Sequence, residues 1–164
     1  MSKIFNLILG LSIMMVVIIS PQVVLDAAAL GVEVNPGEIT LSDVPLGEKI
    51  VVSKASNQRT KLEIENKSTL ACVYKIDILP ASQTSAVIER GYTDIPDTSW
   101  IWPQEKEVMV QAKSTEEVEL FLKVPDEENY KGKNFLAVIE VKSKKNSPEE
   151  IFVVAVQLKI FFST

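Results

Sequence analysis

Two tryptophans separated by one residue are the strongest candidates for a binding site in this chain. Trp100 and Trp102 lie in a Trp-Ile-Trp-Pro segment that ends at Pro103. Alternate residues share a face of an extended chain, so we expect both indoles to point the same way. A pair of coplanar indoles on a loop forms a platform for a sugar or a proline-rich peptide. Large aromatic side chains usually pack, however, which favours the other interpretation, that this loop folds back and both rings plug one end of the domain.

Catalytic chemistry has few candidates. The chain contains no histidine, so Ser/His/Asp and Cys/His arrangements are excluded. Its single cysteine, Cys72, lies on the apolar face of a predicted strand and is interpreted as a small buried hydrophobic residue. A glycosidase-type carboxylate pair stays open, but only Asp77 and Glu140 lie on apolar strands, at positions that fit solvent-facing or edge sites. We therefore expect a protein that is not an enzyme, with no catalytic residues and no cofactor.

Two further motifs favour turns over ligand sites. Asp126, Glu127 and Glu128 are adjacent carboxylates, whereas a calcium loop needs alternating ligands and a glycine bend, so we expect a solvated turn and no metal. Asn66-Lys67-Ser68 matches the acceptor pattern for N-glycosylation and equally an Asx-type hairpin turn, which is the reading we favour.

The charge of the chain restricts its partners. Twenty-two acidic and seventeen basic residues give a formal net charge of −5. Such a domain does not attract polyanions, so we expect no nucleic-acid partner. The basic residues form no cluster suited to anionic lipid, so a membrane is expected only through an uncleaved leader. A protein is the expected partner.

The first 29 residues resemble a secretory signal peptide. Lys3 precedes an apolar run from Ile4 to Ile19, Pro21 then breaks any helix, and Ala27–Ala29 supply the small residues of a cleavage site. The run would form a helix of about 24 Å, shorter than the roughly 30 Å hydrocarbon core of a bilayer. We expect cleavage after Ala29 and an extracytoplasmic mature domain, residues 30–164, with an uncleaved anchor as the alternative.

The remaining chain alternates apolar and polar residues with period two, which is typical of half-buried strands. Turn signals separate about nine such segments: Val32–Asn35, Glu38–Ser42, Lys49–Ser53, Arg59–Glu65, Ala71–Leu79, Glu107–Lys113, Glu117–Val124, Phe135–Val141 and Ile151–Phe162. The two segments on either side of Asn66-Lys67-Ser68 are predicted to form an antiparallel pair.

Three of these regions carry further expectations. Phe135–Val141 is apolar on both faces, which is typical of a central strand. Ile151–Phe162 is long and apolar, and we expect it to be central to folding and to serve as an edge to which a partner adds a strand. Pro80–Pro103 is irregular and is predicted as a loop.

The spacing of strands and turns predicts an all-β, antiparallel, immunoglobulin-like β-sandwich of about seven to nine strands. No sustained helical repeat occurs between the strands, so parallel βαβ units are not expected. We expect one domain after the leader.

The pattern resembles prokaryotic exported immunoglobulin-like domains, a class that includes major-sperm-protein-like domains and the N-terminal domain of pilus chaperones. An early strand ends in Pro36-Gly37, a later one ends in Asn66-Lys67-Ser68, and a third ends in Val124-Pro125 before Tyr130-Lys131-Gly132 and Phe135. The immunoglobulin disulfide is missing, and Phe135 stands where many relatives have a tyrosine. No basic pair is assigned to the cleft in which a pilus chaperone anchors a subunit.

The resemblance implies a binding or structural module of the cell envelope or surface. Such a module engages a protein partner through a sheet edge or end loops. The alternatives are a periplasmic chaperone-like module that caps exposed strands of partner subunits, and a carbohydrate-binding module that uses Trp100 and Trp102.

Overall fold

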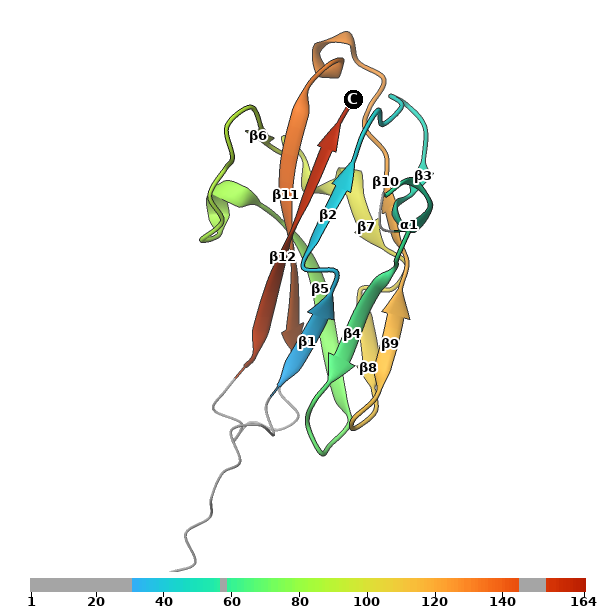
Figure 1. Cartoon of the computed structure of the whole chain (residues 1–164), viewed down its shortest axis with the longest axis vertical. Helices are drawn as coiled ribbons and strands as arrows, with labels where there is room; N and C mark the ends of the chain where they lie inside the picture. The colour runs from blue at the N-terminus through green and yellow to red at the C-terminus, as the bar shows by residue number, and fades with distance from the viewer. Residues whose placement is uncertain (1–30, 57–58, 145–152) are drawn as a thin grey trace, which may run out of the picture.

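An elongated β-sandwich is formed by the residues that the computed structural model describes, which are 31–56, 59–144 and 153–164 (Figure 1). These residues are all-β with twelve strands, more than the seven to nine predicted. Helices are limited to single turns, α1 (Val52–Ala55), η2 (Ala81–Gln83), η3 (Thr98–Trp100) and η4 (Glu128–Tyr130). In this part of the chain no helix combines the length and apolar character needed to cross a membrane.

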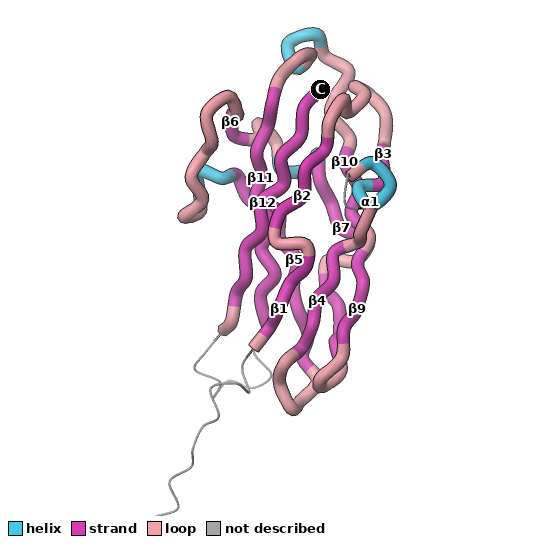
Figure 2. The backbone as a smooth tube through the Cα atoms, viewed as in Figure 1, coloured by secondary structure: helices cyan, strands magenta, loops and turns pink. Residues whose placement is uncertain are grey.

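Three sheets make up the sandwich (Figure 2). One sheet has the order β1-β4-β9, with β1 (Val32–Asn35), β4 (Leu62–Asn66) and β9 (Thr115–Val118). A small sheet has the order β3-β10-β7, with β3 (Ile50–Val51), β10 (Leu120–Leu122) and β7 (Ile101–Pro103). The largest has the order β2-β12-β11-β5-β8, with β2 (Glu38–Leu41), β12 (Ala155–Ser163), β11 (Asn134–Ser143), β5 (Cys72–Pro80) and β8 (Glu107–Val110), and β6 (Thr93–Asp94) pairs with β11.

Period-two alternation places one apolar row of each strand in a shared core. In β4, Leu62 and Ile64 are buried while Glu63 and Glu65 face outward. β11 is buried on both faces and lies between β12 and β5, so its prediction as a central strand is confirmed. The second apolar face forms a separate small cluster on the outside of the large sheet, made of Ala81, Leu136, Val138 and Phe161.

The predicted pairing of the strands around Asn66 is wrong. β4 pairs with β1 and β9, whereas β5 pairs with β11 and β8 in the other sheet. The connection between them therefore crosses from one sheet to the other. Alternation indicates which residues face the core, but it does not identify the partner of a strand.

The first two strands also belong to different sheets. β1 pairs antiparallel with β4, and after Pro36-Gly37 the chain continues as β2, which pairs in parallel with Lys159 to Phe162 of β12. The Asn35–Pro36 peptide bond is cis. Because β1 and β2 pair in different sheets, this short segment of the chain contributes to both layers of the sandwich.

Other predicted segments differ in detail. The predicted strand Glu117–Val124 is two strands, β9 and β10, that lie in different sheets. Only Ile50 and Val51 of Lys49–Ser53 are in a strand, and the predicted loop Pro80–Pro103 contains β6 and β7. The leader and the first two residues of the predicted last strand, Ile151 and Phe152, lie outside the described residues.

Candidate functional site

Trp100 is a core residue. It ends the single turn η3, which begins after Asp97, whose side chain accepts a hydrogen bond from the Ser99 amide at 2.8 Å. The indole is 5% exposed and makes edge-to-face contacts with Tyr130 and Phe135, at centroid distances of 4.8 and 5.4 Å. The expectation of two coplanar exposed indoles is therefore wrong for Trp100, because a helical turn and not an extended chain precedes Trp102.

Trp102 occupies a different environment. It lies in the middle of β7, is half-buried, and pairs across the small sheet with Phe121 of β10. The two rings are tilted by 33° with centroids 5.9 Å apart. The Lys49 ammonium group lies 3.7 Å from the Phe121 ring centroid and 5.6 Å from that of Trp102. Phe121 therefore takes the place beside Trp102 that the sequence assigned to Trp100.

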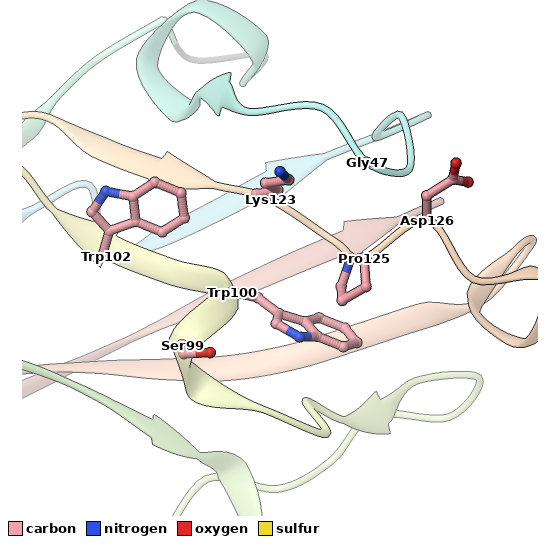
Figure 3. A pocket seen from close by; sticks show the side chains of 7 residues that line it. All are labelled: Gly47, Ser99, Trp100, Trp102, Lys123, Pro125 and Asp126. Carbon is pink, nitrogen blue, oxygen red and sulfur yellow. The ribbon is translucent and has the colours of Figure 1, made fainter.

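An open cleft of about 540 Å³ borders Trp102 (Figure 3). Its lining consists of Gly47, Ser99, Trp100, Trp102, Lys123, Pro125 and Asp126. Gly47 has φ of +75°, and a Cβ atom there would lie 3.0 Å from Cβ of Asp126. The close approach of these two loops therefore requires glycine. The cleft combines an aromatic edge with a cation, a hydroxyl and a carboxylate, and ligand binding at Trp100 and Trp102 stays a prediction.

A local sequence pattern could have identified Phe121 as part of this site, but none could have identified Lys49. Phe121 stands on the polar side of its predicted strand, in line with Glu119 and Lys123. An aromatic side chain on an otherwise charged, outward-facing row of a strand is expected to pack against another apolar side chain. In the structure Phe121 packs against Trp102. The position of Lys49 depends on the pairing of β3 with β10, which local patterns do not predict.

β2 pairs with only part of the outer edge of β12. The Ser143 amide donates to the Val154 carbonyl at 2.9 Å, which makes Val154, Val156 and Leu158 the residues that bond to β11. The backbone groups of Ala155 and Gln157 consequently point to the opposite side. Within the described residues β2 pairs with β12 only from Lys159 to Phe162, so the edge at Ala155 and Gln157 is not paired by β2.

A loop with an apolar tip stands beside this edge. Val87 and Ile88 are exposed, by 74% and 39%, and Glu89 forms an ion pair with Lys159 of β12 at 3.1 Å. A cavity of about 180 Å³ lies between the loop and the strand, lined by Ser85, Ala86, Val138, Gln157, Leu158 and Lys159. The base of the loop is held by Asp94, which accepts from the Ala81 amide at 2.6 Å.

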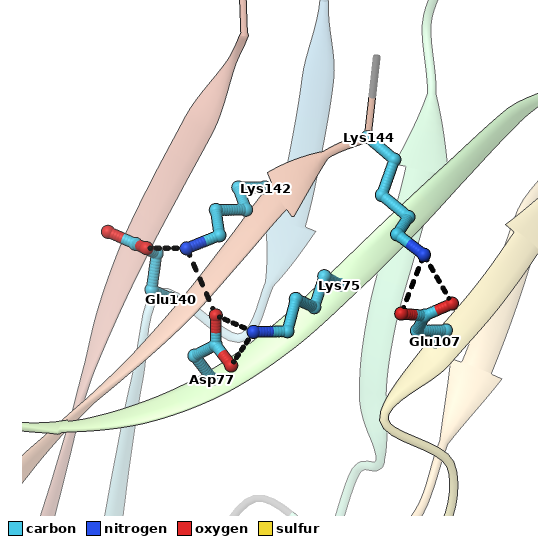
Figure 4. A network of polar contacts seen from close by, with 6 residues as sticks. All are labelled: Lys75, Asp77, Glu107, Glu140, Lys142 and Lys144. Carbon is cyan, nitrogen blue, oxygen red and sulfur yellow. Dashed lines mark hydrogen bonds and ion pairs between the residues drawn. The ribbon is translucent and has the colours of Figure 1, made fainter. Parts of the chain in front are cut away.

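Asp77 and Glu140 lie side by side in a network of lysines. They face each other on the outer side of the two central strands β5 and β11, not at an edge (Figure 4). Lys142 contacts Asp77 at 3.0 Å and Glu140 at 3.2 Å, and Lys75 contacts Asp77 at 2.7 Å. Partial burial raises the pKa of Asp77, but the hydrogen bonds and charges of Lys75 and Lys142 lower it by more, so the net pKa is below its ordinary value. A general acid needs the opposite shift.

This network predicts a dependence of stability on pH. A carboxylate with a lowered pKa stabilises the fold above its ordinary pKa, and the contribution is lost as the pH falls through the lowered value. Between about pH 4 and pH 2, the free energy of unfolding should therefore fall less steeply for Asp77→Asn than for the wild type. Urea unfolding at several pH values measures the slope. Glu127→Gln, at an exposed position, is the control, and an Asp77→Asn slope equal to this control would contradict the prediction.

Asn66 is a structural residue and not a glycosylation acceptor. Its side chain is fully buried. Nδ2 donates to the carbonyls of Leu70 at 2.8 Å and Val110 at 3.0 Å, and Oδ1 accepts from the Ser68 amide at 3.0 Å and the Tyr74 hydroxyl at 3.2 Å. The Ser68 bond is the predicted Asx turn. Because Nδ2 already uses its hydrogens inside the protein, a glycan has no access to it in the folded state.

The acidic turn Asp126–Glu128 is exposed. Across the part of the chain that the structure describes, no group of three or more His, Cys, Asp or Glu side chains is arranged to hold a metal ion. Cys72 is half-buried and packs against the main core, consistent with its interpretation as a hydrophobic residue.

Comparisons with known proteins identify the fold. No protein-family model matches the sequence, and the curated protein sequences contain no match. Among solved structures, PapD-like domain 7 of human CEP192 matches with a TM-score of 0.57 and 13% identity, over 84% of this chain and 87% of that domain. The periplasmic chaperone SfaE matches with a TM-score of 0.53 and 10% identity, over 81% of this chain and 57% of the chaperone.

A third match comes from the complex of the Salmonella enterica SafB chaperone with SafA pilin, with a TM-score of 0.53 and 10% identity, over 82% of this chain and 54% of that chain. The present chain thus spans about half the length of these chaperone-related chains. At such identities the matches show the fold alone. The chain has the fold of PapD-like and pilus-chaperone domains, so the resemblance predicted from the sequence is confirmed at that level.

Proposed function

We propose that the chain is an exported, non-enzymatic domain that caps an exposed strand of a protein partner through the part of the β12 edge that β2 does not pair. The observation that carries this proposal is the partial pairing of β12, which β2 covers only from Lys159 onward. A strand whose outward amides and carbonyls are unpaired is a template for an added strand.

The chemistry around this edge specifies the partner strand. Val154 and Val156 are half-buried and face the inside of the sandwich, whereas Ala155 and Gln157 are exposed on the outside. A strand paired to this edge would continue both faces of the sheet, so apolar residues should alternate with polar ones along it. Val87 and Ile88 at the loop tip offer a further apolar contact beside the same edge.

The comparisons support a chaperone-like role more than a permanent structural one. SfaE is a periplasmic chaperone, and SafB was solved in complex with a pilin. The predicted leader, Met1–Ala29, supports export to the compartment in which such proteins act. A scaffold component of the envelope would instead form a stable stoichiometric complex, whereas a chaperone-like module captures subunits before they assemble.

Proline substitution at alternate positions of β12 tests the edge directly. Ala155→Pro removes an outward amide and leaves the bonds to β11 intact, whereas Val156→Pro removes a bond of that ladder. We expect Ala155→Pro to stay folded and to lose capture of partner proteins from an envelope extract. The matched variant Ala155→Val, which keeps the amide, should retain capture.

Hydrogen exchange gives a second readout that needs no partner. The amides of Ala155 and Gln157 should exchange much faster than those of Val156 and Leu158, because only the latter pair is bonded to β11. Equal protection of all four amides would show that the edge is covered within the domain. That result, or unchanged capture by Ala155→Pro, would rule out strand addition at β12.

A further inference from the structure

The outward face of the small sheet β3-β10-β7 is chemically distinct from the β12 edge. Across this face the middle row consists of Val51, Phe121 and Trp102, which are neighbours in the register of the three strands and are all half-buried. The tilted Trp102–Phe121 pair therefore forms a continuous aromatic surface of moderate exposure. It is held on strands, which fixes the rings more firmly than a loop would.

Two lysines lie beside this aromatic row. Lys49 immediately precedes β3 and Lys123 immediately follows β10, at the end where Ile50 pairs with Leu122. Lys123 is two residues from Phe121 and so shares its face, and the Lys49 ammonium group lies over the Phe121 ring. Two like charges on neighbouring strands repel each other unless an anion lies between them.

Neither of these lysines has a carboxylate partner among the residues that the structure describes. Seven other lysines do, namely Lys61, Lys67, Lys75, Lys131, Lys142, Lys144 and Lys159, whereas four more described lysines, Lys54, Lys106, Lys113 and Lys133, have no such partner either. Lys49 and Lys123 differ from these four because they lie together beside an aromatic surface, which gives this surface a local positive charge in a domain with a net charge of −5. It favours a ligand that carries negative charge.

The adjoining cleft adds groups that accept hydrogen bonds. Ser99 and Asp126 are exposed and line it together with Lys123 and Trp102 (Figure 3). A ligand here would stack an apolar face on Trp102, present negative charge to the two lysines, and offer hydroxyls to the polar groups of the cleft. A pyranose that carries a carboxylate has all three features, since its C–H face is apolar and its hydroxyls both donate and accept.

We propose that the surface formed by Trp102, Phe121, Lys49 and Lys123, with the adjoining cleft, binds a saccharide that carries a carboxylate. Trp102 stacks on the sugar ring, Phe121 holds the Trp102 ring in place, and Lys49 and Lys123 bind the carboxylate. A peptide whose side chains are all carboxylates would satisfy the lysines, but those side chains offer no flat apolar face to Trp102. This site is independent of strand capping at β12.

Titration with small saccharides tests the proposal on the whole chain. Trigalacturonate and 3′-sialyllactose are the acidic probes, maltotriose and lactose their neutral counterparts, and hexaglutamate represents an acidic peptide. Calorimetry and the shift of tryptophan fluorescence report binding. We expect at least one acidic sugar to bind at least about tenfold more tightly than its neutral counterpart. Its affinity should fall as the salt concentration rises from about 20 to about 200 mM.

Variants assign the binding to this surface. Lys123→Gln should lower the affinity for the acidic sugar by about tenfold. It should leave the melting temperature unchanged, because the Lys123 side chain is exposed. Trp102→Ala should lower the affinity by a similar factor, whereas Lys106→Gln, an exposed lysine outside the cleft, should bind as the wild type does. The proposal is wrong if neither acidic sugar binds, if hexaglutamate binds as tightly, or if Lys123→Gln and Lys106→Gln behave alike.

Discussion

Replacing Asn66 with alanine is expected to lower the free energy of unfolding by roughly 2–4 kcal/mol, since a buried group that loses its partner costs about 1–3 kcal/mol. The substitution leaves the Val110 carbonyl and the Tyr74 hydroxyl without the amide that they contact. Tyr74 is itself buried, and burial raises the pKa of its hydroxyl far above the ordinary value, so the group cannot compensate by ionising. The expected loss of stability therefore comes from the hydrogen bonds of neutral groups around Asn66, where the chain crosses from one sheet to the other.

Denaturant unfolding measures this effect, with Asn129→Ala as the matched control. Asn129 lies in η4, is exposed, and should change stability by less than about 0.5 kcal/mol on truncation. Asn66→Asp is a sharper variant, because it keeps an oxygen for Ser68 and Tyr74 but loses both donors of Nδ2. If Asn66→Ala were no less stable than Asn129→Ala, the Asn66 network would not support the fold.

Truncating Trp100 is expected to cost roughly 3–5 kcal/mol of stability, the range for a large aromatic side chain removed from a packed core. The indole contacts Tyr130 and Phe135, and Phe135 in turn packs on Phe162 with centroids 5.3 Å apart. Trp102→Ala should cost less, about 1–2 kcal/mol, because its half-buried ring loses fewer contacts. The two variants therefore separate a core role from a surface role.

Fluorescence distinguishes the two indoles without truncation. The chain contains two tryptophans, so Trp102→Phe leaves only Trp100 to emit, and Trp100→Phe leaves only Trp102. We expect blue-shifted emission that resists soluble quenchers from Trp100, and more accessible emission from Trp102. Strong quenching of the Trp100 signal in the native protein would contradict its placement in the core.

The sequence predicted the faces of strands better than their neighbours. The two-sided apolar pattern of Phe135–Val141 placed this strand at the centre of a sheet, as the structure has it, because burial of both faces is a local property. The pairing of Arg59–Glu65 with Ala71–Leu79 failed because a polar turn permits either a hairpin or a crossing between sheets. Partner choice is decided by contacts between distant segments, and a single sequence does not record them.

The candidate site shows the same limit. Trp100 and Trp102 were grouped on the assumption of an extended chain, although Asp97-Thr98-Ser99 carries the features of a helix N-cap and first turn. A predicted turn at these residues would have placed the two indoles on different faces. The contact of Trp102 with Phe121, and the position of Lys49 over both rings, join residues from three segments of the chain and were beyond local patterns.

The parallel pairing of β2 with β12 has a consequence for how the domain is made. It joins residues 38–41 to residues 159–162, which are about as far apart as two segments of this domain can be. During synthesis β2 has no partner in the large sheet until Lys159–Phe162 have been added. Contacts so distant in sequence form slowly, so the nascent chain carries an unpaired β2 until its last strand arrives. Completion of the sandwich is therefore an event that follows synthesis of β12.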